Sequence, residues 1–372
     1  MEKIKILMVM GSTNMGGTQM FILNLLNNMD LSNYQVDFVV NFEEKDGGIS
    51  KELHSLGCEI FFLPYFRVYN YFGFARAWRD FLKNHRYDIV HGHSSNSASV
   101  YLRIAKKMGC KTIVHCHSTG FRGSWLNRLF KRIFTLGIKR VADYWFACSS
   151  IAAEHLFGNN YNEYKNYYCI PDAINAENYI YSKEISDRVR QKINVSDDCF
   201  LCGHVGSFTL PKNHTFLLDV FSEIVKLKPN SKLVCCGSGA LLTSIKEKAS
   251  ELGIIDRIIF PGVVKNTNEY LMSMDVFVFP SIFEGFGIAI LESEATGLPV
   301  VMSDVVPDEV ILTDRVYKLS LSDSPKKWAE VICKIPKGNR ESYNRVVINS
   351  KYNMKDCAKI VMSLYEEMVN KE

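Results

Sequence analysis

The sequence predicts an α/β protein built from two doubly wound domains, and three observations carry this prediction. The chain has 372 residues, which is long for one domain and suits two. Hydrophobic residues make up 47% and charged residues 23%, a composition typical of globular proteins rather than disordered, collagenous or integral-membrane chains. Short apolar runs alternate with helical patterns, which indicates parallel sheets covered on both faces.

The first half of the chain contains one complete series of this kind. Apolar runs predict strands at Ile4–Met10, Tyr34–Val40, Glu59–Leu63, Asp88–His91, Lys111–His115 and Ala142–Cys148, the last of which closes the series. Helical spacing predicts helices at Gln19–Asn28, between the second and third strands, at Phe72–Asn84 and at Ser97–Met108. The polar, tyrosine-rich stretch 159–182 is the expected boundary region.

The pattern then restarts in the second half. Strands are expected at Phe200–Val205, Lys232–Cys236, Arg257–Phe260, Val276–Pro280 and Val300–Ser303. Helices are expected at His214–Leu227, Leu241–Leu252, Thr267–Met274, Ile288–Thr296 and about Lys355–Val369. We therefore predict domains at 1–180 and 181–354, with the helix at 355–372 packing back on the first. Two such domains facing each other leave a ligand cleft between the carboxyl ends of their strands.

The charge is unevenly distributed along the chain. The net charge is +4, and residues 1–198 carry 24 basic and 19 acidic side chains, whereas residues 199–372 carry 20 and 21. A basic first half favours an anionic partner. Nucleic acid is disfavoured, because no motif of a known reader is present and the second half is not cationic. No run reaches the ~18–20 apolar residues of a spanning helix, and the first residues lack a signal-peptide pattern, so we expect a cytoplasmic protein.

Cysteine and histidine spacings give no metal or redox site. The eleven cysteines are an odd number and many lie in apolar runs, which indicates reduced core thiols. The pair Cys199 and Cys202 lies in a strand-like run without a second pair. The pairs His91-Gly-His93 and His115-Cys-His117 lie at strand ends and lack a cysteine or carboxylate partner at zinc spacing.

The segment 277–304, FVFPSIFEGFGIAILESEATGLPVVMSD, carries the most chemical information. A strand ends at Pro280, a loop holds Glu284 and two glycines, and a helix begins near Gly287. The free amides of a helix start form a phosphate site, and glycine lets a ligand approach the backbone. Glu284 and Glu292 can reach the same pocket, where carboxylates accept hydrogen bonds from hydroxyl groups. A sugar nucleotide satisfies both features.

This Glu-x7-Glu pattern, within PSxxEGFGxxxLExxxxGLPVV, resembles the retaining glycosyltransferases of family 4, which have the GT-B fold. The resemblance covers nearly the whole chain. It implies that Glu284 contacts the donor sugar hydroxyls and that Glu292 binds the ribose. It also implies that the amides of Phe286, Gly287 and Ile288 meet the diphosphate and the sugar.

Other segments of the chain resemble the same family. In Gly206-Ser-Phe-Thr-Leu-Pro-Lys-Asn, Lys212 matches the lysine that grips the donor diphosphate, but Ser207 stands where an arginine is expected. Gly16 and Gly17 match a Gly-Gly turn close to the donor phosphate and the acceptor. His117 stands near a histidine that faces the donor sugar, and His115 is the competing assignment.

Two further segments are interpreted as structural or membrane-facing. Cys169-Ile-Pro-Asp-Ala-Ile-Asn175 resembles the family's linker turn, so Asp172 is expected to shape a turn without chemistry. Residues 120–140 hold six basic and no acidic residues among apolar side chains. They could form a core-packed helix with a cationic back or lie peripherally on an anionic membrane, the inner face of the cell membrane. The family favours the membrane, since many relatives extend lipid-linked saccharides.

We therefore predict a retaining hexosyltransferase that moves a sugar from a nucleotide sugar, with UDP as the expected carrier, to a saccharide or lipid-linked acceptor. Bacterial surface polysaccharide is the expected product. Neither a cofactor nor an essential metal is expected. The alternatives are a non-catalytic sugar-nucleotide-binding GT-B protein, a sugar-nucleotide epimerase and an NAD-dependent oxidoreductase. The last rests on Gly237-Ser-Gly239, in which the third glycine of the dinucleotide fingerprint is replaced by Leu242.

Overall fold

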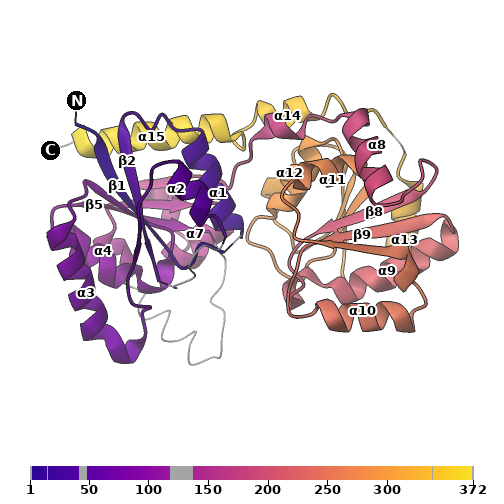
Figure 1. Cartoon of the computed structure of the whole chain (residues 1–372), viewed down its shortest axis with the longest axis horizontal. Helices are drawn as coiled ribbons and strands as arrows, with labels where there is room; N and C mark the ends of the chain where they lie inside the picture. The colour runs from indigo at the N-terminus through magenta and orange to yellow at the C-terminus, as the bar shows by residue number, and fades with distance from the viewer. Residues whose placement is uncertain (1, 15, 42–47, 118–136, 337, 371–372) are drawn as a thin grey trace. The chain divides into compact units, whose positions relative to one another are not determined.

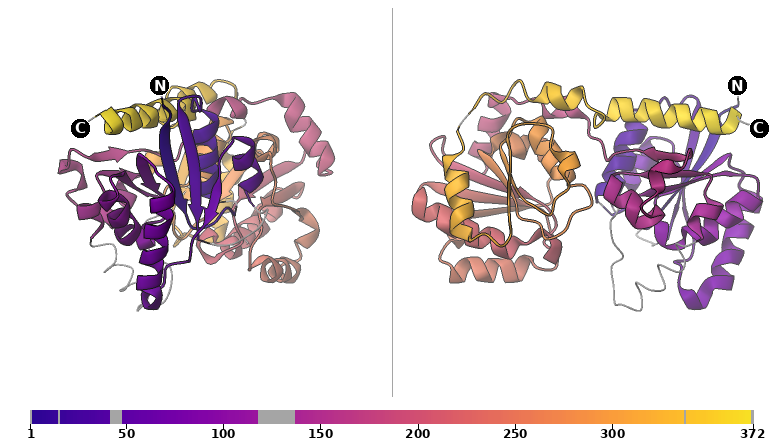
Figure 2. Two further views of the ribbon diagram at one scale, coloured as in Figure 1. Left: turned by 60° about the vertical axis from the view of Figure 1, so that its left-hand side comes forward. Right: turned by 180° about the vertical axis from the view of Figure 1, so that it is seen from behind.

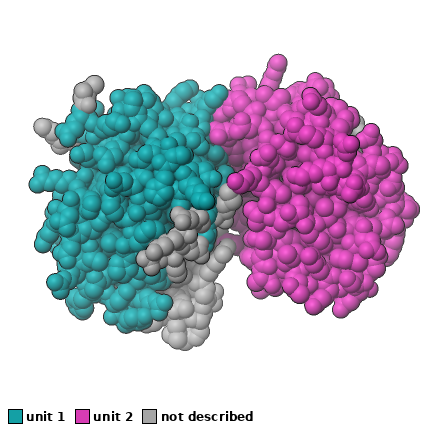
Figure 3. Space-filling model, in the orientation of Figure 1, with its two compact units in different colours: residues 1–173, 354–372 teal, residues 174–353 magenta. Residues whose placement is uncertain are grey.

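The computed structural model describes residues 2–14, 16–41, 48–117, 137–336 and 338–370. The chain divides into two compact units (Figure 3). Unit 1 comprises Met1–Ala173 and Met354–Glu372, and unit 2 comprises Ile174–Asn353. Each unit has a parallel sheet with helices on both faces, so the predicted fold class is confirmed. The first crossing between units lies at Ala173, earlier than the boundary expected at residue 180, and it gives the short 3-10 segment η4 (Ala176–Tyr179) to unit 2.

Unit 1 contains a seven-stranded parallel sheet in the order β3-β2-β1-β4-β5-β6-β7. Its strands are β1 (Ile4–Met10), β2 (Tyr34–Val40), β3 (Ile60–Phe62), β4 (Ile89–Gly92), β5 (Lys111–Cys116), β6 (Tyr144–Ala147) and β7 (Tyr167–Cys169). The sequence-based expectation that the series closes at Cys148 is wrong, because β7 pairs with β6 inside the stretch assigned to a boundary. Tyrosines fill β7, and only part of their surface is buried, so the strand lacks the apolar run that identified the others.

The strands of unit 1 are buried on both faces because their alternate side chains enter two separate cores. In β1, Leu7 and Val9 join one core, whereas Ile6, Met8 and Met10 join the other. The helices are α1 (Gly17–Asn27), α2 (Ser50–Ser55), α3 (Tyr71–Asn84), α4 (Ala98–Lys107), α6 (Ile138–Val141), α7 (Ser150–Phe157) and α15 (Met354–Asn370). The last of these packs beside α1 on the second core, although more than 300 residues separate it from α1 in the sequence (Figures 1 and 2).

Unit 2 contains a six-stranded parallel sheet in the order β10-β9-β8-β11-β12-β13. Its strands are β8 (Phe200–Val205), β9 (Ser231–Cys236), β10 (Ile258–Gly262), β11 (Val276–Phe279), β12 (Val300–Ser303) and β13 (Val316–Leu319). Its helices are α8 (Lys183–Lys192), α9 (His214–Leu227), α10 (Leu242–Glu251), α11 (Thr267–Ser273), α12 (Ile288–Ala295), α13 (Pro325–Lys334) and α14 (Asn344–Ile348). Side chains from α9, α10 and α13 pack on one face, and side chains from α11, α12 and α14 pack on the other.

Each sheet reverses its strand order once, and this reversal positions the candidate sites. The switch lies between β1 and β4 in unit 1 and between β8 and β11 in unit 2. At such a point the two loops that leave the carboxyl ends of the strands run to opposite faces, which opens a crevice for a ligand. The segments that the sequence singled out, 206–213 and 280–287, are these two loops of unit 2.

The basic segment at 120–140 lies almost wholly within 118–136, outside the described residues, and only its last residues enter α6. Among the helices of the described ranges, none combines the length and apolarity that a membrane crossing requires.

Candidate active site

Two loops at the switch point of unit 2 hold a partly buried ion pair. Lys212 ends the 3-10 segment η5 (Leu210–Lys212) after β8, and Glu284 lies in the loop after β11. Lys212 Nζ donates a hydrogen bond of 2.7 Å to Glu284 Oε1, and the side chains are 21% and 11% exposed. A backbone hydrogen bond of 2.8 Å from Ile282 N to Pro211 O ties the loops together. The pair therefore lies in a shielded position, and each charge neutralises the other.

The lysine of this pair also contacts an aromatic ring. Lys212 Nζ lies 4.5 Å from the ring centre of Phe279, the last residue of β11. A ring face attracts a cation at this distance, and the attraction strengthens where water is excluded. The ammonium group is therefore held at the strand end by two neighbours, one charged and one aromatic.

Glu292 lies on α12 and has a partner that the sequence did not indicate. Tyr179 Oη, in η4, donates a hydrogen bond of 2.6 Å to Glu292 Oε1. Burial raises the pKa of Glu292 to about 7, and the hydrogen bond from Tyr179 acts in the opposite direction. Burial also raises the pKa of Tyr179, with a further contribution from the charge of Glu292, so the tyrosine remains a donor. Glu292 therefore changes between acid and carboxylate near neutral pH.

The start of α12 is shaped by Gly287. This residue has φ 95° and ψ 52°, a left-handed conformation that favours glycine, and no side chain caps the helix start. Phe286 is 3% exposed and its ring packs 5.1 Å from that of Tyr352, so Phe286 can offer a ligand only its backbone. Ile288 is the first helical residue and is partly exposed. Uncapped amides at a helix start favour an anion.

Ser207 is exposed, and its Oγ lies 3.3 Å from Thr209 Oγ1. The structure therefore places a hydroxyl group, not a cation, where the resemblance expects arginine. The adjacent loop explains the glycines of the dinucleotide-like segment. A Cβ on Gly237 would lie 2.1 Å from Gly206 O, and a Cβ on Gly239 would lie 2.5 Å from Phe208 O. Both glycines are required for the close packing of two backbones, which accounts for them without a dinucleotide.

The Gly-Gly turn of unit 1 lies at the start of α1. Gly16 has extended backbone and precedes the helix, and a Cβ there would lie 2.9 Å from Gln19 Oε1. The Gln19 side chain turns back to donate a hydrogen bond of 2.9 Å to Ser12 O. No described atom lies within 4 Å of the position that a Cβ on Gly17 would occupy. The turn therefore leaves open space beside Gly17.

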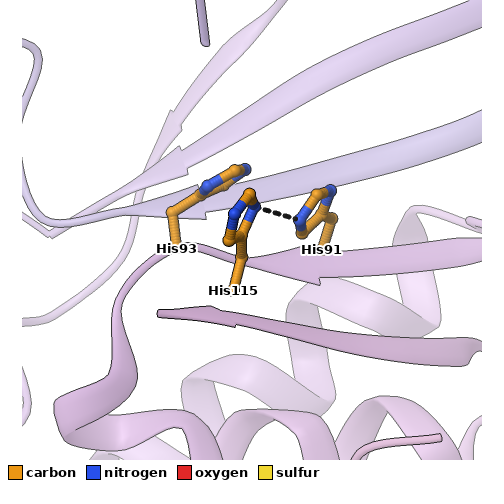
Figure 4. A group of neighbouring side chains, drawn as sticks. All are labelled: His91, His93 and His115. Atoms are coloured by element: carbon orange, nitrogen blue, oxygen red, sulfur yellow. Dashed lines mark hydrogen bonds between the residues drawn. The ribbon is translucent and has the colours of Figure 1, made fainter. Parts of the chain in front are cut away.

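Four histidines gather at the carboxyl ends of β4 and β5, and Figure 4 shows three of them. His91 Nε2 and His115 Nδ1 lie 3.3 Å apart, and His115 Nε2 lies 3.3 Å from Ile170 O. Because a carbonyl only accepts, His115 Nε2 carries the hydrogen, and His91 Nε2 then donates to His115 Nδ1. The remaining nitrogen of His91 accepts the hydrogen bond of 2.7 Å from Tyr365 Oη on α15. Burial, together with the neighbouring imidazoles, lowers the pKa of His91 and of His115, so both rings are neutral.

A second chain of hydrogen bonds contains His117. Its Nδ1 lies 2.8 Å from Asp172 Oδ1 and its Nε2 lies 2.9 Å from His93 Nδ1, so both ring nitrogens are engaged. The His117 side chain is only 5% exposed. Asp172, which was expected only to shape a turn, therefore positions His117. His93 Nε2 is buried and has no hydrogen-bond partner among the described residues.

His91, His93 and His115 place one ligand atom each within 4.8 Å of one another, a grouping that could suggest a metal. The hydrogen bonds argue against that interpretation, because His91 and His115 each use both ring nitrogens. A metal would have to displace two of these bonds, and a neutral ring with a free nitrogen is available only at His93.

Both halves of the chain match known protein families. Residues 185–353 match the family described as "Glycosyl transferases group 1", and residues 15–178 match the family described as "Glycosyltransferase Family 4". The chain belongs to the family 4 glycosyltransferases of the GT-B fold.

Relatives of this chain are themselves named as glycosyltransferases. The protein named "Putative glycosyltransferase EpsF" of Bacillus subtilis (strain 168) is 29% identical over 344 residues, covering 90% of this chain and 88% of that protein. The capsular polysaccharide biosynthesis glycosyltransferase CapH of Staphylococcus aureus is 25% identical over 351 residues, covering 89% and 90%. Among solved structures, Anabaena Alr3699/HepE in complex with UDP and glucose superposes with a TM-score of 0.80 at 15% identity, covering 98% and 99% of the chains. That likeness supports the fold.

Two residues of the glycosyltransferase's candidate site were not identified from sequence. Tyr179 is 113 positions from Glu292, and Asp172 is 55 positions from His117. Both lie in the polar stretch that was assigned to a boundary. The presence of an acid in the Pro-Asp turn was the only available signal for Asp172, and nothing in the sequence distinguished Tyr179 from the other tyrosines around it.

Proposed function

We propose that this glycosyltransferase transfers the sugar of a UDP-sugar to a saccharide or lipid-linked saccharide acceptor, with retention of the anomeric configuration. The product would be part of a bacterial surface polysaccharide. The observation that carries the proposal is the Lys212–Glu284 ion pair at the switch point of unit 2. A cation for a diphosphate and a carboxylate for sugar hydroxyls lie together there. The names of CapH and of the UDP complexes of HepE support the product class and the carrier.

In this proposal the donor diphosphate lies against the start of α12. The amides of Phe286, Gly287 and Ile288 offer hydrogen bonds, and the helix dipole favours negative charge there. Lys212 supplies a mobile positive charge on a flexible stem. The diphosphate has to compete with Glu284 for that ammonium group, since the two side chains are bonded to each other. Ser207 adds a hydroxyl donor in place of the missing arginine.

The two carboxylates bind different parts of the donor, the sugar and the ribose. Glu284 accepts hydrogen bonds from the sugar hydroxyls once Lys212 has turned to the phosphate. Glu292 accepts hydrogen bonds from the ribose, and Tyr179 holds it in the ionised form that this role needs. The two roles differ in what they should affect. Loss of Glu292 affects binding of the nucleotide, whereas loss of Glu284 affects the transfer step.

The reaction itself needs no covalent intermediate on the protein. The acceptor hydroxyl oxygen bonds to the anomeric carbon on the face that the diphosphate leaves, the bond from that carbon to the phosphate oxygen breaks, and the hydroxyl proton passes to the leaving oxygen. Lys212 and the α12 amides stabilise the charge that develops on the diphosphate. Because these groups supply the electrostatic stabilisation, we expect no essential metal, and turnover measured in EDTA should equal turnover without it.

The acceptor side of the proposal rests on unit 1. Gly17 leaves space at the start of α1. The ring of His117 is fixed by Asp172 and His93, and its centre lies 5.3 Å from the ring centre of Phe21 on the same helix as Gly17. One relative, from Escherichia coli, is named as a galactosyltransferase that acts on a diphosphoundecaprenol-linked sugar, at 25% identity over 60% of this chain. We extend this acceptor class to the present protein, working at the cytoplasmic face of the membrane with residues 120–140 as its peripheral contact.

The test compares two conservative variants. Glu292→Gln should weaken UDP binding about tenfold, because a neutral amide accepts hydroxyl hydrogen bonds less strongly than a carboxylate. Glu284→Gln should leave UDP binding unchanged or tighter, because it frees Lys212, while it lowers turnover by about 100-fold. UDP affinity is measured by calorimetry and turnover by release of UDP from UDP-sugars, first screened by thermal shift.

The matched control is Glu251→Gln, which makes the same change at an exposed position at the end of α10 and should alter neither quantity. Weaker UDP binding in Glu284→Gln would contradict the assignment of Lys212 to the diphosphate. A product of inverted configuration, measured by the anomeric coupling in its proton NMR spectrum, would contradict retention.

A further inference from the structure

A second cavity of unit 2 lies at the opposite edge of the sheet from the switch-point loops. It has a volume of about 480 Å³. Asp275, Pro299 and Arg315 line it, and each directly precedes a strand, β11, β12 and β13 respectively. Because all strands of a parallel sheet begin at the same edge, this cavity opens at the amino ends, away from Lys212 and Glu284. None of the groups assigned to the donor lines it.

Three arginines line this cavity, and two of them have their donors occupied. Arg340 donates five hydrogen bonds, to the carbonyls of Leu271, Met272, Met274 and Thr296 and to Thr296 Oγ1. Arg190 donates four, to the carbonyls of Ser273, Ser196 and Cys199 and to Asp275 Oδ2 at 2.6 Å. These two guanidinium groups hold the surrounding backbone together. The charge of Arg190 is paired with Asp275, whereas the acceptors of Arg340 named above are carbonyl and hydroxyl oxygens.

Arg315 is different from the other two. It is 8% exposed, yet with the described residues its guanidinium makes one hydrogen bond, from Nη2 to Pro336 O at 3.2 Å, and stacks 5.5 Å from the ring centre of Tyr343. It forms no ion pair with an acid of the described chain. A guanidinium carries five N–H donors in a planar fork, and most of those of Arg315 have no partner among the described residues, so they can serve a ligand in the cavity. A nine-tenths buried cation without a carboxylate is costly unless an anion completes it.

The charges around the cavity favour an anion. Lys183 is paired with Asp187, and Arg190 is paired with Asp275. This leaves Arg315 and Arg340 against a single further acid, the exposed Asp197. Burial lowers the pKa of Arg340 to about 10; the charges of Arg315 and Arg190 act in the same direction, and Tyr181 and Asp275 act in the opposite one.

We propose that this cavity binds a small phosphorylated molecule, with the phosphate held by the guanidinium fork of Arg315 next to the charge of Arg340. A phosphate accepts the two parallel hydrogen bonds that the fork offers, and its negative charge complements the two arginines. The volume exceeds that of a bare phosphate and falls within the range of small-molecule pockets, about 300–1,000 Å³. A sugar phosphate therefore satisfies both the charge and the space. The site is separate from the donor site and does not depend on the function proposed above.

The test measures binding to the full chain by calorimetry in phosphate-free buffer at constant ionic strength, with glucose 1-phosphate and inorganic phosphate as probes. Glucose 1-phosphate should bind saturably and more tightly than inorganic phosphate. Arg315→Gln should weaken it at least tenfold, and Arg315→Lys, which keeps the charge but loses the fork, should give an intermediate affinity. Arg345→Gln, the same change at an exposed position of α14, should leave the affinity unchanged.

Two further variants keep the proposal falsifiable. Lys212→Gln should not alter the affinity, and loss of binding in that variant would assign the probe to the donor site and overturn the proposal. Asp197→Asn removes an exposed negative charge from the rim without disturbing the core, and it should tighten binding severalfold even if Arg315→Gln does not fold. Absence of saturable binding, equal binding by Arg315→Gln, or unchanged binding by Asp197→Asn would each overturn the proposal.

Discussion

At the scale of single residues, the site is made of charges that are already paired inside the protein. Lys212 is bonded to Glu284, and Glu292 accepts a hydrogen bond from Tyr179. Such pairing keeps buried charges tolerable and sets their protonation, because an uncompensated buried charge is far more costly than a paired one. It also means that the binding of a ligand is an exchange of partners, which gives each pair a measurable signature.

The pKa of Glu292 gives the first signature. Burial raises it to about 7, so the carboxylate form is lost as the pH falls through 7. Because the charged form is the better acceptor for ribose hydroxyls, the affinity for a UDP-sugar should rise between pH 6 and pH 8 and then level off. A UDP-sugar is the suitable probe because, unlike free UDP, it has no phosphate that ionises at about pH 6. Calorimetry across this range measures the effect. Glu292→Gln should bind weakly with no such rise, and a rise that persists in this variant would assign the titration to another group.

Tyr179 gives the second signature. Tyr179→Phe removes the donor that favours the ionised form of Glu292, so UDP affinity at pH 7 should fall about 3–10-fold, the range of one hydrogen bond of about 0.5–1.5 kcal/mol. The midpoint of the pH dependence should also move upward. In a double-mutant cycle, Tyr179→Phe should have no further effect once Glu292→Gln is present. Additive losses would show that Tyr179 acts on the nucleotide by another route.

The sequence could identify the paired carboxylates but not their partners. Glu284 and Glu292 stand in a loop-and-helix pattern that can be interpreted locally, from glycines and a helix start. Tyr179, Asp172 and Tyr365 reach their partners across 113, 55 and 274 positions. Contacts over such separations are made by the tertiary fold, and no local pattern records them.

At the scale of elements, α12 lies between two left-handed glycines, Gly287 and Gly297, and its acidic side chains contact different neighbours. Glu292 and Glu294 are two positions apart and point to different partners. Glu294 Oε1 accepts hydrogen bonds from Leu312 N, Thr313 N and Thr313 Oγ1, and so holds the loop before β13. One acid of this helix is therefore available for the site, and the other is structural. The bounds of α12 were predicted closely, because Gly287 and Gly297 mark its two ends.

A matched pair of glycines tests the C-terminal end of this helix. Gly297 after α12 has φ 66° and Gly253 after α10 has φ 67°, both left-handed. A Cβ on Gly253 would meet nothing within 4 Å, whereas a Cβ on Gly297 would lie 2.3 Å from Arg340 O. Gly253→Ala should therefore cost only the left-handed backbone, about 1–2 kcal/mol, and Gly297→Ala should cost clearly more. Urea unfolding followed by circular dichroism measures both. Equal midpoints would show that the backbone at 339–341 can move away from the new methyl group without lowering the free energy of unfolding.

The two strands that the sequence missed share a physical reason. β7 and β13 are short strands at sheet edges, and most of their side chains are only partly buried. Edge strands need fewer apolar residues, so they lack the runs by which β1 or β8 could be identified. Four inner strands, β1, β2, β8 and β12, were predicted with their bounds as observed, because most of their residues are buried and apolar.

At the scale of the whole molecule, the burial of the cysteines shows that both units have closely packed cores. None of the eleven forms a disulfide, and all but two are buried. Burial raises the pKa of buried thiols, for instance that of Cys236 to about 12, which keeps them unreactive. A maleimide reagent should therefore label Cys169 first, then Cys333, and the others only in urea. Mass spectrometry of tryptic peptides identifies the sites.

Cys169→Ser should remove the fast phase of this labelling and leave the slower phases unchanged. Rapid labelling of Cys199 or Cys202 in the native protein would contradict the buried-strand interpretation of that pair. The same measurement would also show whether the units open separately, since Cys58 and Cys110 lie in the core of one and Cys202 and Cys235 in the core of the other.

The return of α15 to unit 1 affects the order in which the protein can be made. Met354, Cys357, Val361 and Met368 complete a core whose other members come from the first 173 residues. During translation, the sheet of unit 1 lacks the helix that covers part of one apolar face until the whole of unit 2 has been synthesised. Unit 2 is a continuous stretch of the chain, so it can fold as soon as its own residues have left the ribosome. The later-synthesised half is therefore the one expected to reach its native state first, and the earlier half is the one that depends on chaperones during translation.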